Sequence, residues 1–101
     1  MQRCAFATLV MLGDAYVCGA LVLGWSLRSV GSQAKLVVMV NGVSADGQAA
    51  LKEVFDEVVA VELIEAKAVQ QDWKRFKNTY RWIDKSFTKF NVLRLTRYDK
   101  V

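Results

Sequence analysis

The chain has no histidine and no proline among its 101 residues, and only two cysteines. Without histidine, it can supply neither the imidazole base of a catalytic triad nor a histidine ligand for zinc. Cys4 and Cys18 lie fourteen residues apart, which is not a CxxC spacing. Both fall in apolar segments, so we expect buried free thiols and a reducing, cytoplasmic environment.

Two phosphate-binding motifs and a membrane span are also missing. The sequence has neither a GxGxxG fingerprint nor a GxxxxGK[ST] loop. The longest apolar stretch, residues 15–27, is shorter than the ~20 residues that cross a bilayer, and Gly19 and Gly24 interrupt it. The N-terminus lacks the apolar core of a signal peptide. We therefore expect a buried helix over residues 15–27 and no membrane partner.

Acidic and basic residues are unevenly distributed. Residues 1–66 carry a net charge of −3 and residues 67–101 one of +7, which gives the overall +4. An anionic ligand would favour the second part. Aromatic residues alternate with lysine and arginine over residues 73–97, so a basic domain that binds nucleic acid or another anion is one alternative function. Nucleic acid is nevertheless the less favoured partner.

The first half of the chain alternates between strand and helix patterns. Residues 4–12 form a nearly continuous apolar run, which predicts a strand buried on both faces, and Asp14 is placed to cap the helix that follows. Arg28 falls in the last turn of that helix and Gly31 ends it.

A second strand over residues 35–40 leads to a helix over residues 45–55, which Ser44 caps, and a third strand covers residues 58–63. This succession predicts a doubly wound α/β fold with a mostly parallel sheet. Ligands of such folds bind at the carboxyl ends of the strands, so the loop over residues 12–14 is the first candidate site.

The second half is less regular. Residues 66–79 suggest a short helix and a loop. Ser86 or Asp84 is placed to cap a last helix through Arg97, and Phe87, Phe90, Leu93 and Leu95 give that helix a partial apolar face. Residues 98–101 suggest a turn and the first residue of a fourth strand. The predicted sheet therefore stops after about three and a half strands.

Four ordered segments resemble one known family. Residues 5–27, AFATLVMLGDAYVCGALVLGWSL, resemble the opening of the family 8 glycosyltransferases, the group of glycogenin and galactinol synthase. Residues 35–43, 51–59 and 87–101 resemble its second strand, the approach to its third strand and the helix before its Asp-x-Asp motif. The resemblance implies that residues 1–101 are the N-terminal nucleotide-binding part of a single glycosyltransferase domain of the nucleotide-diphospho-sugar transferase type. This part is incomplete because it ends before the acidic motif.

The family's activity is the transfer of a hexose from a nucleotide-sugar donor, usually a UDP-sugar, with retention of configuration. A manganese ion acts there as a Lewis acid on the diphosphate. The resemblance places its ligands outside this chain, names no catalytic residue within it and implies that the fragment alone is inactive. The resemblance does not decide whether the acceptor is a sugar, a polyol or a protein, or whether the protein forms a homodimer. A non-catalytic interaction module with a decayed nucleotide site is a further alternative.

The resemblance also assigns donor-binding residues by position. The strand end made by Thr8, Leu9, Val10 and Met11 would face the uridine with its backbone. Tyr16 matches the tyrosine that stacks on the uracil ring. Lys89 and Arg81 match side chains that reach the phosphates or the sugar, where an ammonium and a guanidinium both suit phosphate oxygens.

Overall fold

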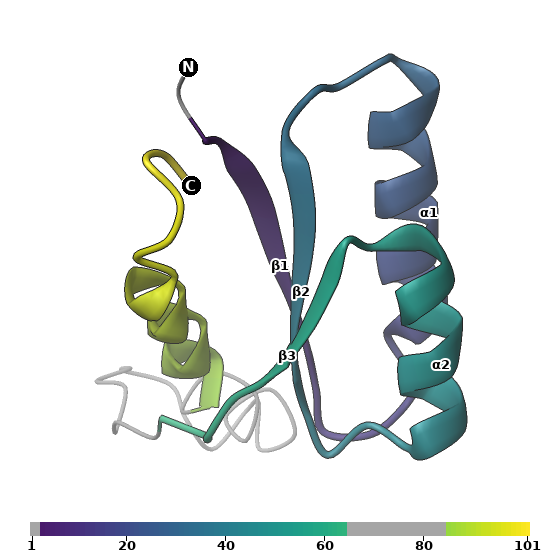
Figure 1. The fold of residues 1–101 in the computed structure, drawn as a ribbon. Helices are drawn as coiled ribbons and strands as arrows, with labels where there is room; N and C mark the ends of the chain where they lie inside the picture. The colour runs from purple at the N-terminus through teal and green to yellow at the C-terminus, as the bar shows by residue number, and fades with distance from the viewer. Residues whose placement is uncertain (1–2, 65–84) are drawn as a thin grey trace, which may run out of the picture.

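A computed structural model describes residues 3–64 and 85–101 of the chain. Its centre is a three-stranded parallel sheet of β1 (Ala5–Met11), β2 (Lys35–Asn41) and β3 (Glu57–Ala60), in the order β1-β2-β3. Helices α1 (Val17–Ser29) and α2 (Ala45–Val54) cover one face, and the 3₁₀ helix η2 (Ser86–Arg94) lies on the other (Figure 1). This three-layer arrangement confirms the predicted α/β fold.

Strand β1 is paired on both of its edges, so the order of the strands along the sheet changes direction there. Its residues pair with β2 from Ala5 opposite Lys35 to Met11 opposite Asn41. On its other edge, Cys4 forms a parallel bridge with Lys100, and the Ala5 amide donates to the Lys100 carbonyl at 2.9 Å. The last residues of the chain thus begin to pair with β1, as predicted for the start of a fourth strand. The carboxyl ends of all three strands lie at the bottom of Figure 1.

The main core lies between the sheet and the two α-helices. β2 is buried along most of its length because it has a neighbour on each edge. Leu51 of α2 is fully buried there, and α1 approaches α2 closely at Gly24. A Cβ atom at Gly24 would lie 2.5 Å from Val54 Cγ1 and 3.3 Å from the Phe55 ring. The buried members of this core are Val10, Val17, Ala20, Leu36, Val38, Val40, Val43, Leu51, Val54 and Phe55.

The burial predicted for β1 and for the cysteines is wrong in part. Phe6 is half exposed, because among the described residues β1 has a full neighbour only on the β2 side. Helix α1 buries one side only, with Val17, Ala20 and Gly24, so Cys18 on the opposite side is exposed. Cys4 is only partly buried.

Helix α1 begins at Val17, with Tyr16 at the N-cap position and no side-chain cap. The prediction that Asp14 caps it is wrong, because the Asp14 carboxylate binds Ser44 instead. The stop at Gly31 is confirmed by its φ of 77°. Ser44 caps α2 as predicted, since its Oγ accepts from the Gly47 amide at 3.0 Å.

The last helix also differs from its prediction. It is a 3₁₀ helix that ends at Arg94, with Lys85 at the N-cap position, so it does not continue to Arg97. Phe90 and Leu93 are exposed, and the buried polar residues are Thr88 and Asn91. Their spacing of three matches the three residues per turn of a 3₁₀ helix.

β3 is shorter than predicted and ends at Ala60, although the Val61 amide still donates to the Val40 carbonyl at 2.9 Å. Asp84 and the helix and loop predicted over residues 66–79 lie outside the described residues. No helix within residues 3–64 and 85–101 has the length and apolarity needed to span a bilayer.

Candidate functional site

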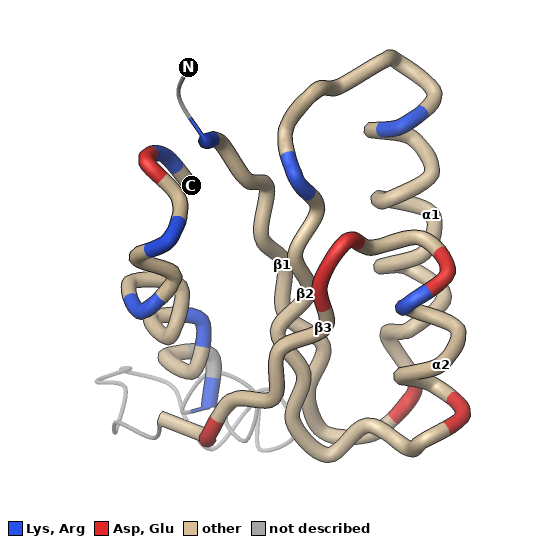
Figure 2. Tube along the Cα trace, viewed as in Figure 1, with Lys and Arg blue, Asp and Glu red and all other residues tan. Residues whose placement is uncertain are grey.

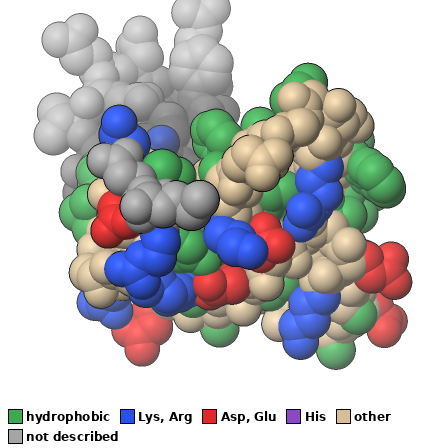
Figure 3. All heavy atoms as spheres, turned by 45° about the horizontal axis from the view of Figure 1, so that its top comes forward, with side chains coloured by type: hydrophobic (Ala, Val, Ile, Leu, Met, Phe, Trp, Pro, Cys, Tyr) green, Lys and Arg blue, Asp and Glu red, His purple; other side chains and the backbone are tan. Residues whose placement is uncertain are grey.

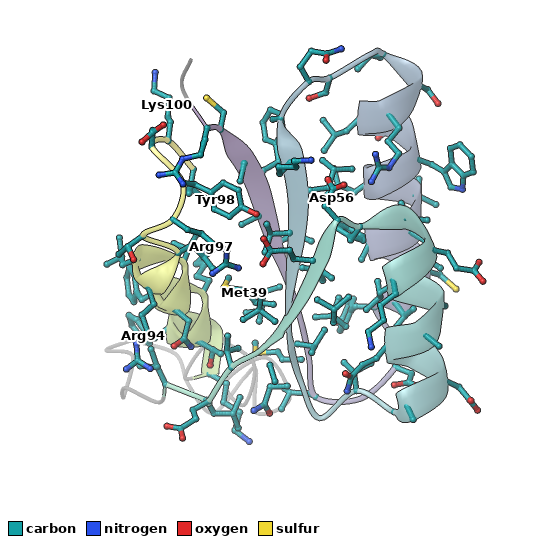
Figure 4. The ribbon with its side chains drawn as sticks, in the orientation of Figure 1. Met39, Asp56, Arg94, Arg97, Tyr98 and Lys100 are labelled. Carbon is teal, nitrogen blue, oxygen red and sulfur yellow. The ribbon has the colours of Figure 1, made fainter. Side chains whose placement is uncertain are left out.

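An apolar cleft separates the sheet from η2 beside the strand at which the order reverses. Its volume is about 510 Å³. One wall comes from β1 and β2 and the other from η2, and Met39 lies in the space between the sheet and η2 (Figure 4). The lining residues are Ala7, Thr8, Leu9, Met39, Lys89, Phe90 and Val92.

The alternation of side chains along β1 determines which of its residues face this cleft. Ala7 packs with the small core on the η2 side, where Ala5, Val37 and Leu95 are buried. Leu9 shares that face, because residues two apart in a strand point the same way. Val10 points to the opposite face and is buried in the main core.

Two buried polar side chains fix the position of η2. Thr88 Oγ1 accepts from the Ile64 amide at 3.0 Å. Asn91 Nδ2 donates to the Glu62 carbonyl and to the Thr88 carbonyl, both at 2.8 Å. The bonds to Ile64 and Glu62 connect η2 to the segment that follows β3.

Lys89 and Phe90 lie between the two anchors and are exposed. The Phe90 ring stacks on Phe87, with their centroids 5.8 Å apart. An ammonium group and an aromatic ring therefore occur side by side on the η2 wall of the cleft. Such a wall suits a ligand that combines a flat apolar ring with a negative charge.

The loops after β1 and β2 are tied together at the carboxyl end of the sheet. The Asp14 carboxylate accepts from the Ser44 amide at 2.8 Å and from Ser44 Oγ. Both bonds favour the charged form and lower the pKa of Asp14. The backbone turns sharply here, with positive φ at Leu12 (63°), Gly13 (101°) and Gly42 (68°). Leucine rarely adopts such a φ, so the loop is held in a strained conformation.

The structure places the predicted site residues in three different situations. Thr8, Leu9 and Lys89 line the same cleft, although they are far apart in the sequence. Val10 and Met11 are each only 1% exposed and do not line the cleft. Tyr16 is half exposed just before α1, but it is not among the residues that line the cleft. Arg81 lies outside the described residues.

Sequence reasoning missed four of the lining residues: Ala7, Met39, Phe90 and Val92. Met39 could have been found from strand pairing, because it lies opposite Leu9. Phe90 is predicted only as part of an apolar helix face, and the structure places it half exposed on the wall of the cleft.

Manganese does not fit the described residues. They contain no group of three or more histidine, cysteine, aspartate and glutamate side chains that could hold a metal ion. The carboxylate of Asp14, in the loop after β1, already accepts two hydrogen bonds from Ser44.

A second cavity, of about 530 Å³, opens at the amino end of the sheet. Arg97 and Tyr98 both donate hydrogen bonds to Glu57, and Arg28 forms an ion pair with Asp56 at 3.5 Å. Figure 3 shows basic and acidic side chains in alternation at this end. Both acidic groups of this cavity are thus paired with basic groups, whereas Lys89 lies among apolar groups in the cleft. The residues that line this second cavity are Arg3, Cys4, Gln33, Lys35, Asp56, Glu57, Arg97 and Tyr98.

The ionisation of these groups reflects their partners. The bonds from Arg97 and then from Tyr98 lower the pKa of Glu57. Partial burial raises the pKa of Asp56, but the Leu36 amide, at 2.7 Å, and Arg28 outweigh it, and the net shift is downward. Burial, and then the Glu57 carboxylate, raises the pKa of Tyr98. Both carboxylates are consequently charged near neutral pH.

Comparison with known proteins points toward glycosyltransferases. No family model matches the chain. It is 32% identical to a glycogenin of Neurospora crassa over 94 residues, which are 91% of the chain. It is 48% identical to glycogenin-2 of Homo sapiens over 63 residues, which are 61% of the chain. It is 27% identical over 101 residues, 99% of the chain, to UDP-glucuronate:xylan alpha-glucuronosyltransferase 1 of Arabidopsis thaliana. The chain spans only 12% to 14% of the length of these three relatives. The similarity supports a glycosyltransferase family.

Proposed function

We propose that this chain is the N-terminal nucleotide-binding part of a glycosyltransferase, and that the cleft between β1 and η2 receives the nucleotide of a nucleotide-sugar donor. One observation carries the proposal. Thr8 and Leu9 of β1 and Lys89 of η2, matched separately to the same kind of ligand, line one cleft. The cleft also adjoins β1, the strand at which the order reverses, but it lies along residues 7–9 and not at the loop over residues 12–14, where doubly wound sheets usually bind their ligands.

The chemistry of the walls suits a nucleotide. The apolar side chains of Leu9, Met39 and Phe90 offer a surface for a flat base, and aromatic rings stack on bases without regard to sequence. The Lys89 ammonium offers a point charge to a phosphate oxygen.

The finer assignments belong to the same proposal. The donor is a UDP-sugar, the transfer retains configuration, and the manganese that would stabilise the leaving diphosphate is held by residues outside this chain. The described residues supply no metal site, so we expect the 101-residue chain alone to bind UDP weakly and to transfer no sugar.

Backbone NMR of the chain with UDP tests the site directly, because chemical shifts detect millimolar affinities. We expect UDP to move the amide signals of residues 7–9 and 89–92. Lys89→Ala should weaken binding about tenfold or more, since bonds to charged groups contribute roughly 1.5–3 kcal/mol. Lys52→Ala, which removes an exposed lysine of α2, is the matched control and should bind as the unchanged chain does.

Other results would overturn the proposal. Absence of UDP-induced shifts at saturating concentration, or shifts confined to the amino end of the sheet, would exclude this cleft as the nucleotide site. Shifts of the same residues by single-stranded RNA but not by UDP would favour a basic anion-binding domain. If longer forms of the protein bind UDP but transfer no sugar, the result would favour a decayed, non-catalytic module.

A further inference from the structure

A third cavity, of about 300 Å³, lies between β3 and η2. It has no lining residue in common with the cleft between β1 and η2. Its volume is at the lower end of the roughly 300–1,000 Å³ of small-molecule sites, so it is suited to a ligand smaller than a nucleotide. Residues 59–62, at the carboxyl end of β3, form one wall. This is the end of the strands at which doubly wound folds bind their ligands.

A buried side chain of this cavity has an acceptor atom without a donor. Asn91 lines the cavity and is only 4% exposed. Its amide nitrogen donates to the carbonyl oxygens of Glu62 and Thr88, at 2.8 Å each. Because carbonyl oxygens only accept, these two contacts identify the nitrogen and leave Oδ1 as the other amide atom. No described residue donates to Oδ1, although buried polar atoms nearly always have a partner. A donor that enters the cavity would satisfy it.

Two side chains of opposite charge line the same cavity. Arg94 follows Asn91 by three residues, which is one turn of a 3₁₀ helix, and Glu62 comes just after β3. Both are exposed, and neither side chain forms an ion pair or a hydrogen bond with another described residue. Arg97, three residues further on, is held by Glu57. Figure 2 shows these basic positions along η2 and after it, and the acidic positions at the start of β3 and just past its end.

This set of groups selects the chemistry of a ligand. Asn91 Oδ1 and the Glu62 carboxylate accept hydrogen bonds, whereas the Arg94 guanidinium only donates them. A simple anion would be repelled by Glu62 and would offer no donor to Oδ1, and a cation would be repelled by Arg94. A hydroxyl group both donates and accepts, so several hydroxyls on one molecule satisfy all three groups. The apolar residues Val59, Val61 and Leu95 provide a surface for the carbon atoms of such a molecule.

We propose that this cavity binds a small, uncharged molecule with several hydroxyl groups, of the size of one sugar or cyclic polyol ring. Asn91 Oδ1 and Glu62 accept from its hydroxyls, and Arg94 donates to one of them. The site is separate from the proposed nucleotide cleft, so binding here does not require a nucleotide.

Backbone NMR of the chain with D-glucose and, separately, with myo-inositol tests the site. We expect at least one of the two compounds to move the amide signals of residues 59–62 and 94–95 and to leave those of residues 7–9 unmoved. Binding of glucose alone would identify a sugar site, and binding of myo-inositol alone a polyol site. UDP is detected at residues 7–9, so failure of either site is distinguishable from failure of the other.

Three variants test the residues that carry the proposal. Arg94→Ala should weaken binding about tenfold or more, because a hydrogen bond from a charged group is lost. Lys52→Ala, at an exposed lysine of α2, is the matched control and should bind as the unchanged chain does. Val61→Phe should abolish binding because its ring occupies the cavity. Circular dichroism confirms that each variant is folded.

Three results would each overturn the proposal. Absence of shifts with both compounds at high concentration would show that the cavity holds water alone. Shifts of residues 59–62 by inorganic phosphate but by neither compound would show an anion site. Equal affinity of Arg94→Ala and the unchanged chain would show that the compounds bind elsewhere.

Discussion

The two faces of the sheet are built differently. On the α1–α2 face, side chains from β1, β2, α1 and α2 form one continuous apolar core. On the η2 face, the buried apolar cluster among the described residues consists of Ala5, Val37 and Leu95, and the contact also uses the polar anchors Thr88 and Asn91. The open cleft lies on this second face.

The difference suggests a division of roles between the two layers. Apolar burial is non-directional and stabilises the fold wherever it occurs. Hydrogen bonds from buried polar side chains contribute less free energy, but they fix one geometry. In this chain the first kind of contact holds the scaffold, and the second kind positions Lys89 and Phe90 beside the candidate site.

The largest expected effect is on the α1–α2 face. Leu51→Ala should lower the free energy of unfolding by about 2–5 kcal/mol, because Leu51 is fully buried and its removal leaves a cavity. Leu93→Ala, at a leucine that is 76% exposed on η2, should change it by less than about 0.5 kcal/mol. Urea denaturation measures both. Similar losses for the two leucines would contradict the contrast between the faces.

A smaller effect is expected from the anchors on the η2 face. Asn91→Ala leaves the carbonyls of Glu62 and Thr88 without their donor, which should cost about 1–3 kcal/mol. Asn91→Asp keeps the size of the side chain but loses the amide donor, and it should cost a similar amount. Hydrogen exchange of the η2 amides should accelerate in both variants. Unchanged exchange would mean that Asn91 does not hold η2 in place.

The smallest effect concerns the ion pairs at the amino end of the sheet. Because the pKa of Glu57 is lowered in the folded chain, its contribution is complete above its unfolded pKa of about 4.3 and is lost as the pH falls through the folded pKa. Glu57→Gln should therefore reduce stability at pH 7 by about 1 kcal/mol or less, as for other largely exposed pairs. Unfolding curves at several pH values should show this difference vanish in acid. A difference that persists at low pH would show that Glu57 acts through packing and not through its charge.

The elements that could be predicted from the sequence are those that depend on local chemistry. The apolar runs of β1 and β2, the Ser44 cap and the stop at Gly31 all follow from short stretches of sequence, and the structure confirms them. The Asp14 cap failed because the carboxylate had a competing partner, Ser44, thirty residues away in the sequence. The ligand roles of Thr8, Leu9, Val10, Met11, Tyr16, Arg81 and Lys89 remain predictions.

The sequence by itself therefore determined the α/β order of elements, because hydrophobic periodicity and turn residues act over a few neighbouring positions. Only the tertiary structure decided that Thr8, Leu9 and Lys89 share a cleft, since η2 packs beside β1, at the opposite edge of the sheet from β3. It also decided which side of α1 is exposed. Residues 15–27 are apolar on all sides, so their sequence pattern does not distinguish the buried side of α1 from the side that Trp25 presents to solvent.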